Sequence, residues 1–151
     1  MQKITLFLWF DNNAEEAIKF YLSIFKKDSK IIRIFRQAKK VTSAKFRLNG
    51  QEFMALNGGP HFKFTPAISL FVNCKTQAEV DRLWKKLSKG GHKSQCGWLQ
   101  DKFGLSWQII PETLGDLLCD KDSRKAERVF QAMMKMTKIE IKELKRAYNQ
   151  K

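Results

Sequence analysis

The chain of 151 residues lacks any hydrophobic run long enough to cross a membrane. The apolar run near its N-terminus, residues 4–10, covers seven residues, whereas a membrane-spanning helix needs about 18 or more. This run meets an acid at Asp11 and has no small-residue cleavage site after it. We therefore expect neither a membrane segment nor a signal peptide.

Cysteine and histidine are scarce, which argues against a disulfide framework and a metal centre. The three cysteines, Cys74, Cys96 and Cys119, are an odd number without the spacing of metal ligands. This pattern favours reduced thiols and a cytoplasmic location. The two histidines, His61 and His92, lie beside glycine-rich segments, and we expect both in surface loops rather than at a metal.

Acidic residues are also few, because 15 Asp and Glu stand against 29 Lys and Arg, for a net charge of +14. Residues 26–47 and 121–151 carry most of the excess. Such stretches can attract nucleic acid or anionic ligands. No aromatic interleaving or nucleic-acid motif accompanies them, so a solvated basic surface is the simpler interpretation.

What the chain does contain is enough apolar sequence, 43% of its residues, for one domain or two half-modules. Periodicity predicts a strand at 4–10, a helix at 13–25, and strands at 30–36, 41–48 and 52–57. Asn13 and Glu16 have the spacing of a capping box for the helix. Asn49 and Gly50 predict a hairpin turn.

The same order of elements restarts after residue 60. It predicts a strand at 67–73, a helix at 76–91 with a Thr76–Glu79 capping box, and strands within 92–101 and 105–111. A shift of 63 residues superimposes the two halves without a gap. The chain is therefore a β-α-β-β-β unit written twice, and its fold class is α+β.

Residues 112–151 do not repeat and read as helical. A short helical turn is predicted at 114–118, an apolar stripe at 126–134, and a last helix opened by a capping box of Thr137 and Glu140. The methionines of the stripe are typical of core or dimer packing. We divide the chain into a domain of residues 1–111, made of modules 1–60 and 61–111, and a C-terminal helical extension, 112–151.

A doubled unit with a D-x-x-G turn before its last strand resembles the vicinal oxygen chelate superfamily of glyoxalases, extradiol dioxygenases and bleomycin- or fosfomycin-resistance proteins. The finer resemblance is to the PhnB-like branch, whose domain is often labelled 3-demethylubiquinone-9 3-methyltransferase. It is carried by LWFDNNAEEAIKFY, FMALNGGPHFKFTPAISLFV, AEVDRLWKKLSKGG, CGWLQDKFGLSWQIIP and RVFQAMMKMTKIEIKELKRAY. The resemblance implies two glyoxalase-like half-barrels and a homodimer. One departure is the segment 36–41, which is shorter than the loop common in relatives.

The resemblance also implies positions for metal ligands. Those positions hold Thr5, Ile68 or the adjacent Ser69, Gln108, and a residue near Leu56, where Asn57 offers an oxygen. None is an imidazole or a carboxylate, and hydroxyls and neutral amides are weak ligands for a transition metal. We therefore expect no metal and no cofactor. Methyl transfer is not favoured either, because the glycines at 58–59 open no predicted helix, as a nucleotide-type site would require.

The aromatic residues on the strands suggest a cup for a small molecule. We expect its ligand-binding residues to be Thr5, Phe7, Trp9, Asn57, Ser69, Cys96, Trp98, Trp107 and Gln108. Aromatic walls with few polar groups suit a planar or mostly apolar ligand. The competing interpretation is that the rings only fill the core.

Functions of different kinds stay open. We favour a metal-independent protein that binds a small molecule in an aromatic-lined cup and forms a homodimer. The alternative is a divalent-metal-dependent enzyme of lyase, dioxygenase or transferase type, using a shifted metal site or Cys96. Nucleic-acid association through the basic segments rests on charge alone and is favoured least.

Overall fold

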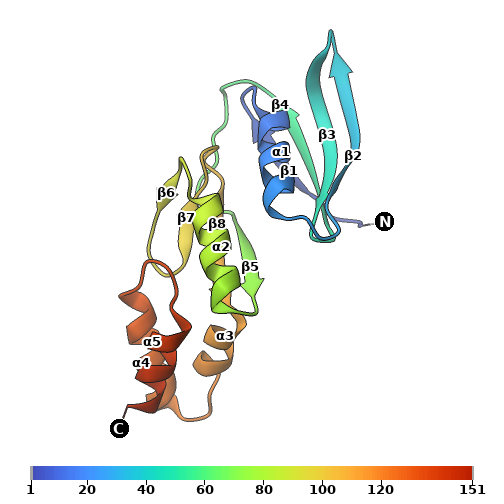
Figure 1. The fold of residues 1–151 in the computed structure, drawn as a ribbon. Helices are drawn as coiled ribbons and strands as arrows, with labels where there is room; N and C mark the ends of the chain where they lie inside the picture. The colour runs from blue at the N-terminus through green and yellow to red at the C-terminus, as the bar shows by residue number, and fades with distance from the viewer. Residues whose placement is uncertain (1, 151) are drawn as a thin grey trace. The chain divides into compact units, whose positions relative to one another are not determined.

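The computed structural model describes residues 2–150, which divide between Phe64 and Thr65 into two compact units. Each unit contains one four-stranded mixed sheet. Figure 1 shows one helix, α1 (Ala14–Ile24) or α2 (Gln77–Leu87), lying against each sheet. The predicted α+β class with two repeated modules and C-terminal helices is confirmed.

The first sheet has the strand order β1-β4-β3-β2. Its strands are β1 (Leu6–Phe10), β2 (Lys30–Gln37), β3 (Lys40–Leu48) and β4 (Gln51–Asn57). β1 runs parallel to β4 and the other pairs are antiparallel. Asn49 and Gly50, with φ of 49° and 87°, make the predicted two-residue turn between β3 and β4.

The second sheet repeats this order as β5-β8-β7-β6. Its strands are β5 (Ser69–Cys74), β6 (His92–Lys93), β7 (Trp98–Gln100) and β8 (Ser106–Pro111). α1 and α2 begin and end 63 residues apart, at 14 and 77 and at 24 and 87, so the repeat seen in the sequence extends to the helix boundaries.

One predicted strand region is interrupted. The segment 92–101 divides into β6 and β7, because Cys96 and Gly97 adopt positive φ values of 57° and 81°. The backbone N–H groups of Cys96 and Gly97 donate to the carbonyls of Met136 and Thr137. The turn between the two strands is therefore also an attachment point for the C-terminal helices.

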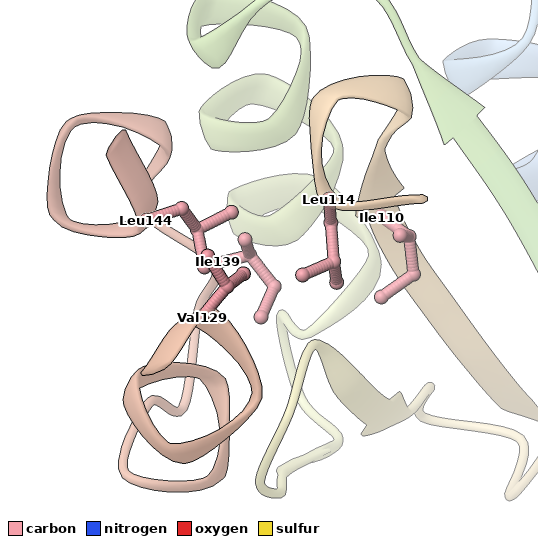
Figure 2. Packing of buried hydrophobic residues seen from close by; sticks show 5 residues of the cluster. All are labelled: Ile110, Leu114, Val129, Ile139 and Leu144. Carbon is pink, nitrogen blue, oxygen red and sulfur yellow. The ribbon is translucent and has the colours of Figure 1, made fainter. Parts of the chain in front are cut away.

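The C-terminal extension shares a core with the end of the second sheet. Its helices are α3 (Glu112–Leu118), α4 (Ser123–Met134) and α5 (Ile141–Asn149). Figure 2 shows the buried side chains that join them to β8, namely Ile110, Leu114, Val129, Ile139 and Leu144. Leu144, on the apolar face of α5, is thus packed within its own chain.

Helix capping agrees with the sequence for α2 and differs for α5. The Glu79 N–H donates to Thr76 Oγ1 at 3.2 Å, as predicted. The predicted Thr137–Glu140 box does not open α5, which begins at Ile141. The side chain of Gln77, on α2, accepts from the Ile141 N–H at 2.8 Å and donates to the Ile139 carbonyl at 3.0 Å. A residue 64 positions away therefore supplies the cap.

Within residues 2–150, no helix has both the length and the apolar character required of a transmembrane segment.

Candidate functional site

The second sheet has one covered face and one open face. Side chains alternate along a strand, so Trp107 and Ile109, which are buried, point to the α2 side. Gln108 lies on the opposite face, in register with Phe71 of β5 and Trp98 of β7. Phe71 is 53% exposed, which identifies this face as the open one. By register and alternation, this open face of the second sheet carries Ser69, Phe71, His92, Trp98, Gln100, Ser106 and Gln108, and also Ile110, over which the C-terminal helices pack.

Three of the predicted ligand-binding residues meet on this face. Gln108 Nε2 donates to Ser69 Oγ at 2.9 Å, across the parallel β5–β8 pair. Trp98 is the neighbour of Gln108 in register on the other side and is partly buried. The hydrogen bond holds the amide of Gln108 against Ser69, and the strand neighbours of Gln108 in register are two large aromatic residues, Phe71 and Trp98. The structure therefore brings together an amide, a hydroxyl and two aromatic side chains.

Trp107, also predicted for the cup, lies on the other face of the sheet. It is 2% exposed, and its Nε1 donates to Asp101 Oδ2 at 2.9 Å. Asp101 Oδ1 accepts from the backbone N–H groups of Phe103 and Leu105. The acid of the D-x-x-G pattern therefore holds a turn and an indole in the core. We leave Trp107 out of the candidate site.

Cys96 is also separate from the open face. Its Sγ lies 3.8 Å from Met134 Sδ and 3.7 Å from the Met133 carbonyl oxygen, both on α4. Its position follows from the turn that binds the extension, and its thiol faces α4 rather than the strands of the sheet. None of the three cysteines forms a disulfide. Burial raises the pKa of the Cys74 thiol to about 12, so Cys74 is no nucleophile near neutral pH.

The first sheet likewise has an open face opposite α1. Phe7 and Trp9 alternate with the buried Leu8 and Phe10 and therefore lie on it. Phe7 is 49% exposed. Thr5 precedes β1 and is not part of the strand.

Trp9 is largely committed to the loop that follows β4. Its Nε1 donates to the Gly59 carbonyl at 2.9 Å, and Phe62 meets its ring edge-on at 4.9 Å. A Cβ at Gly58 would lie 2.3 Å from a ring carbon of Trp9, so only glycine fits beside the indole. The glycines of this segment therefore serve the packing of Trp9.

Asn57 supports a helix. Its Oδ1 accepts from the Ala14 N–H at 2.9 Å, and its Nδ2 donates to the Val41 carbonyl at 3.0 Å. The predicted cap, Asn13, occupies the N-cap position of α1, but its side chain makes no capping hydrogen bond. Asn57 takes over that role from a distant strand, and both ends of its amide are occupied.

Sequence reasoning missed an ionic cluster on the open face of the first sheet. Glu52 binds Lys45 at 2.8 Å and Arg47 at 3.2 Å, and Arg47 also contacts Asp28 at 3.3 Å. The hydrogen bonds from Lys45 and Arg47 lower the pKa of the Glu52 carboxyl. Lys45 and Arg47 alternate with apolar residues along β3, which indicates a charged face in the sequence. Their acidic partner Glu52 lies on β4, so the ion pairs became visible only when the two strands were placed side by side.

The residues at the family's metal positions do not fit a divalent ion. Ser69 and Gln108 are hydrogen-bonded to each other, and Asn57 is held by backbone groups. Within residues 2–150, no three His, Cys, Asp or Glu side chains gather as a metal site would require. His61 is exposed, and His92 is exposed on the edge strand β6 rather than in a loop.

A hollow of about 470 Å³ lies along α4 and α5. One of the residues that line it is Arg128, which donates through Nε to the Ala147 carbonyl and through Nη2 to the Tyr148 carbonyl, both at 3.1 Å. These contacts satisfy carbonyls at the C-terminal end of α5. The guanidinium therefore serves the helix pair, and we do not place the ligand here.

The fold is shared with several solved structures. FosX from Listeria monocytogenes, a genomically encoded fosfomycin resistance protein, has a TM-score of 0.56 at 13% identity, covering 77% of this chain and 97% of its own. A protein from Pseudomonas aeruginosa has a TM-score of 0.62 at 20% identity, covering 74% of this chain and 98% of its own. At these identities the likeness shows a glyoxalase-like fold alone.

A nearer relative shows the family. The profile of the 3-demethylubiquinone-9 3-methyltransferase family matches residues 2–110. A PhnB protein from Bacillus cereus, described under the same methyltransferase label, is 42% identical, covers 73% of this chain and 99% of its own, and has a TM-score of 0.68. No curated protein matches the chain. The chain belongs to this family, the PhnB-like branch of the vicinal oxygen chelate superfamily.

Proposed function

We propose that this chain is a metal-independent, small-molecule-binding member of the PhnB-like branch, and that its ligand lies on the open face of the second sheet. One observation carries the proposal. The amide of Gln108 is held by Ser69, and Phe71 and Trp98 are the register neighbours of Gln108, on a face that α2 does not cover. A fixed amide flanked by rings is the arrangement that orients a planar ligand.

The chemistry of the face supports a planar, largely apolar ligand. Phe71 and Trp98 offer ring surfaces for stacking, which contributes about 0.5–1.5 kcal/mol per aromatic pair beyond burial. One N–H of Gln108 is used by Ser69. Its carbonyl oxygen and second N–H are then available to orient a polar group of the ligand.

Metal independence rests on the donor set. The polar side chains at the family's metal positions are hydroxyls and neutral amides, and those amides already serve Ser69 or the backbone. Methyl transfer from a nucleotide-type cofactor has no support either. Gly58 and Gly59 lie between β4 and β5, accommodate Trp9, and open no helix.

We also retain the homodimer and the cytoplasmic location as proposals. The location is supported by three free cysteines. The dimer does not use the apolar face of α5, because Leu144 of that face is buried in the core of the extension. Light scattering at micromolar concentration tests the dimer, and a monomeric mass would contradict it.

A ligand screen tests the function. Planar aromatic compounds should raise the melting temperature of the protein and quench its tryptophan fluorescence, with and without EDTA, because a ligand that binds only the folded state stabilises it. Gln108→Leu should abolish both effects. The matched control is Gln95→Leu, the same replacement at an exposed turn residue, which should bind as the wild type does.

The outcomes separate the alternatives. Binding that EDTA abolishes and manganese or zinc restores would favour the metal-dependent enzyme. A screen without any shift, together with a neutral Gln108→Leu variant, would show that the rings only fill space.

A further inference from the structure

The hydroxyl of Ser106 is a buried polar group without a protein partner. Ser106 is 1% exposed, and its Oγ makes no hydrogen bond with any group among residues 2–150. By contrast, the buried carboxylate of Asp101 accepts three hydrogen bonds. Since buried hydroxyls are normally bonded, Ser106 needs an explanation that packing alone does not give.

The register places this hydroxyl inside the candidate site. Ser106 is opposite Ser69 on β5 and opposite Gln100 on β7. Gln108 follows two residues later on the same strand and therefore lies on the same face. The hydroxyl is thus surrounded on three sides by the polar side chains of the open face of the second sheet.

This face carries no fixed positive charge. The basic side chains on strands β5 to β8 are Lys93 and His92, and His92 is opposite Gln100 at the outer edge of this face. Lys93 is opposite Leu99, which is buried on the α2 side, so it lies on the covered face. A carboxylate or phosphate placed beside Ser106 would lose water without gaining a lysine or arginine partner from these strands, which is costly. A neutral oxygen would not carry that cost.

We propose that Ser106 is the specificity-determining residue of this site, and that its Oγ–H donates to a neutral carbonyl or ether oxygen on an aromatic ligand, with Gln108 beside it. The inference rests on the proposed function. Gln100 has a long rotatable side chain and is partly exposed, so its rotation opens a path to the hydroxyl while Gln108 keeps its hydrogen bond to Ser69. The site therefore selects neutral aromatic ketones, amides or ethers over aromatic acids.

The free protein gives the first test, through the sign of a stability change. Ser106→Ala removes a buried hydroxyl that no protein group satisfies, so its melting temperature should equal or exceed that of the wild type. Ser69→Ala, on the same face, removes the acceptor of Gln108 and should lower the melting temperature. A lower melting temperature for Ser106→Ala would mean that the hydroxyl has a structural partner, and would overturn the inference.

Binding gives the second test, with three probes of one ring system. The probes are 2-acetonaphthone, its hydrocarbon isostere 2-isopropenylnaphthalene, and 2-naphthoate, titrated against the full chain by fluorescence and calorimetry. The ketone should bind roughly tenfold more tightly than the hydrocarbon, as expected for one hydrogen bond to an otherwise unsatisfied donor. Ser106→Ala should remove that difference and leave hydrocarbon affinity unchanged.

The three probes distinguish failure of this inference from failure of the proposed function. Equal affinity for ketone and hydrocarbon, or tighter binding of 2-naphthoate, would overturn the role of Ser106 while small-molecule binding stands. If none of the probes binds and the wider screen also finds no ligand, the proposed function fails, and the inference fails with it.

Discussion

Trp107 donates its indole N–H to the carboxylate of Asp101 at 2.9 Å, with its ring buried on the α2 side of the second sheet. Trp98, its neighbour on the adjacent strand, lies on the opposite face. The two tryptophans of one short segment thus have different tasks. One holds the core, and the other forms part of the candidate site.

Replacing Trp107 should lower the free energy of unfolding, because its ring belongs to the core. Trp107→Phe keeps a ring but leaves Asp101 Oδ2 short of a donor, so we expect a loss of about 1–3 kcal/mol in the free energy of unfolding. Trp98→Phe, the matched control on the open face, should cost about 1 kcal/mol or less. Denaturant unfolding of both variants measures the difference. Equal losses would contradict the assignment of the two faces.

The caps of α1 offer a second paired test. Asn57→Ala should destabilise the protein by about 1–2 kcal/mol, because the Ala14 N–H loses its acceptor. Asn13→Ala should be nearly neutral, since the Asn13 side chain makes no capping bond. Thermal unfolding followed by circular dichroism compares them. The reverse order of effects would show that Asn13 is the working cap.

These caps also show what the sequence predicted well and where it failed. The repeat, the start of α1 and of α2, and the Asn49–Gly50 turn follow from periodicity and from local side-chain chemistry. The caps of α1 and α5 come from Asn57 and Gln77, distant in sequence, and no local pattern contains that information. Of the predicted helix caps, only Thr76 makes its expected hydrogen bond, because its partner Glu79 is three residues away in the sequence.

The candidate site was predictable in composition more than in arrangement. Ser69, Trp98 and Gln108 do share one face. Alternation alone did not say which face α2 covers, because Trp98 and Trp107 are equally plausible as core residues. Ser106 was missed because a serine in a strand carries no signal of its own. Its unpaired, buried hydroxyl becomes visible only when neighbouring strands are in register.

Gly97 should be intolerant of any side chain. Its φ is +81°, and a Cβ would lie 2.7 Å from Ile110 Cδ1 and 3.1 Å from Ile139 Cγ1. Gly97→Ala should therefore cost about 2 kcal/mol or more and loosen the C-terminal helices from the second sheet. Gly115→Ala, at a position where a Cβ meets nothing within 4 Å, is the control. Hydrogen exchange should report faster exchange in α4 and α5 for the Gly97 variant alone.

The ion pair of Glu15 and Arg36 should make stability depend on acid pH. Two hydrogen bonds from the Arg36 guanidinium, with help from Lys19, lower the pKa of Glu15 from 4.5 to about 2. Because the folded-state pKa is the lower one, the pair stabilises the protein fully above pH 4.5, and its contribution disappears as the pH falls towards 2.

Melting temperatures between pH 2 and pH 6 test this dependence. Glu15→Gln should lower the melting temperature at pH 6 and have no effect near pH 2. Arg36→Gln should show the same trend, since it removes the other partner. A Glu15→Gln effect that stays constant over this range would mean that the ion pair does not contribute to stability.

The most direct test of the proposed site is to map ligand contacts in solution. Backbone amide shifts of labelled protein should be recorded during titration with 2-acetonaphthone or with the best compound of the screen. The largest changes should fall on β5, β7 and β8, centred on Ser69, Phe71, Trp98, Ser106 and Gln108, and should persist in EDTA. Changes confined to the α4–α5 hollow, or to the first sheet, would contradict the placement of the ligand on the open face of the second sheet.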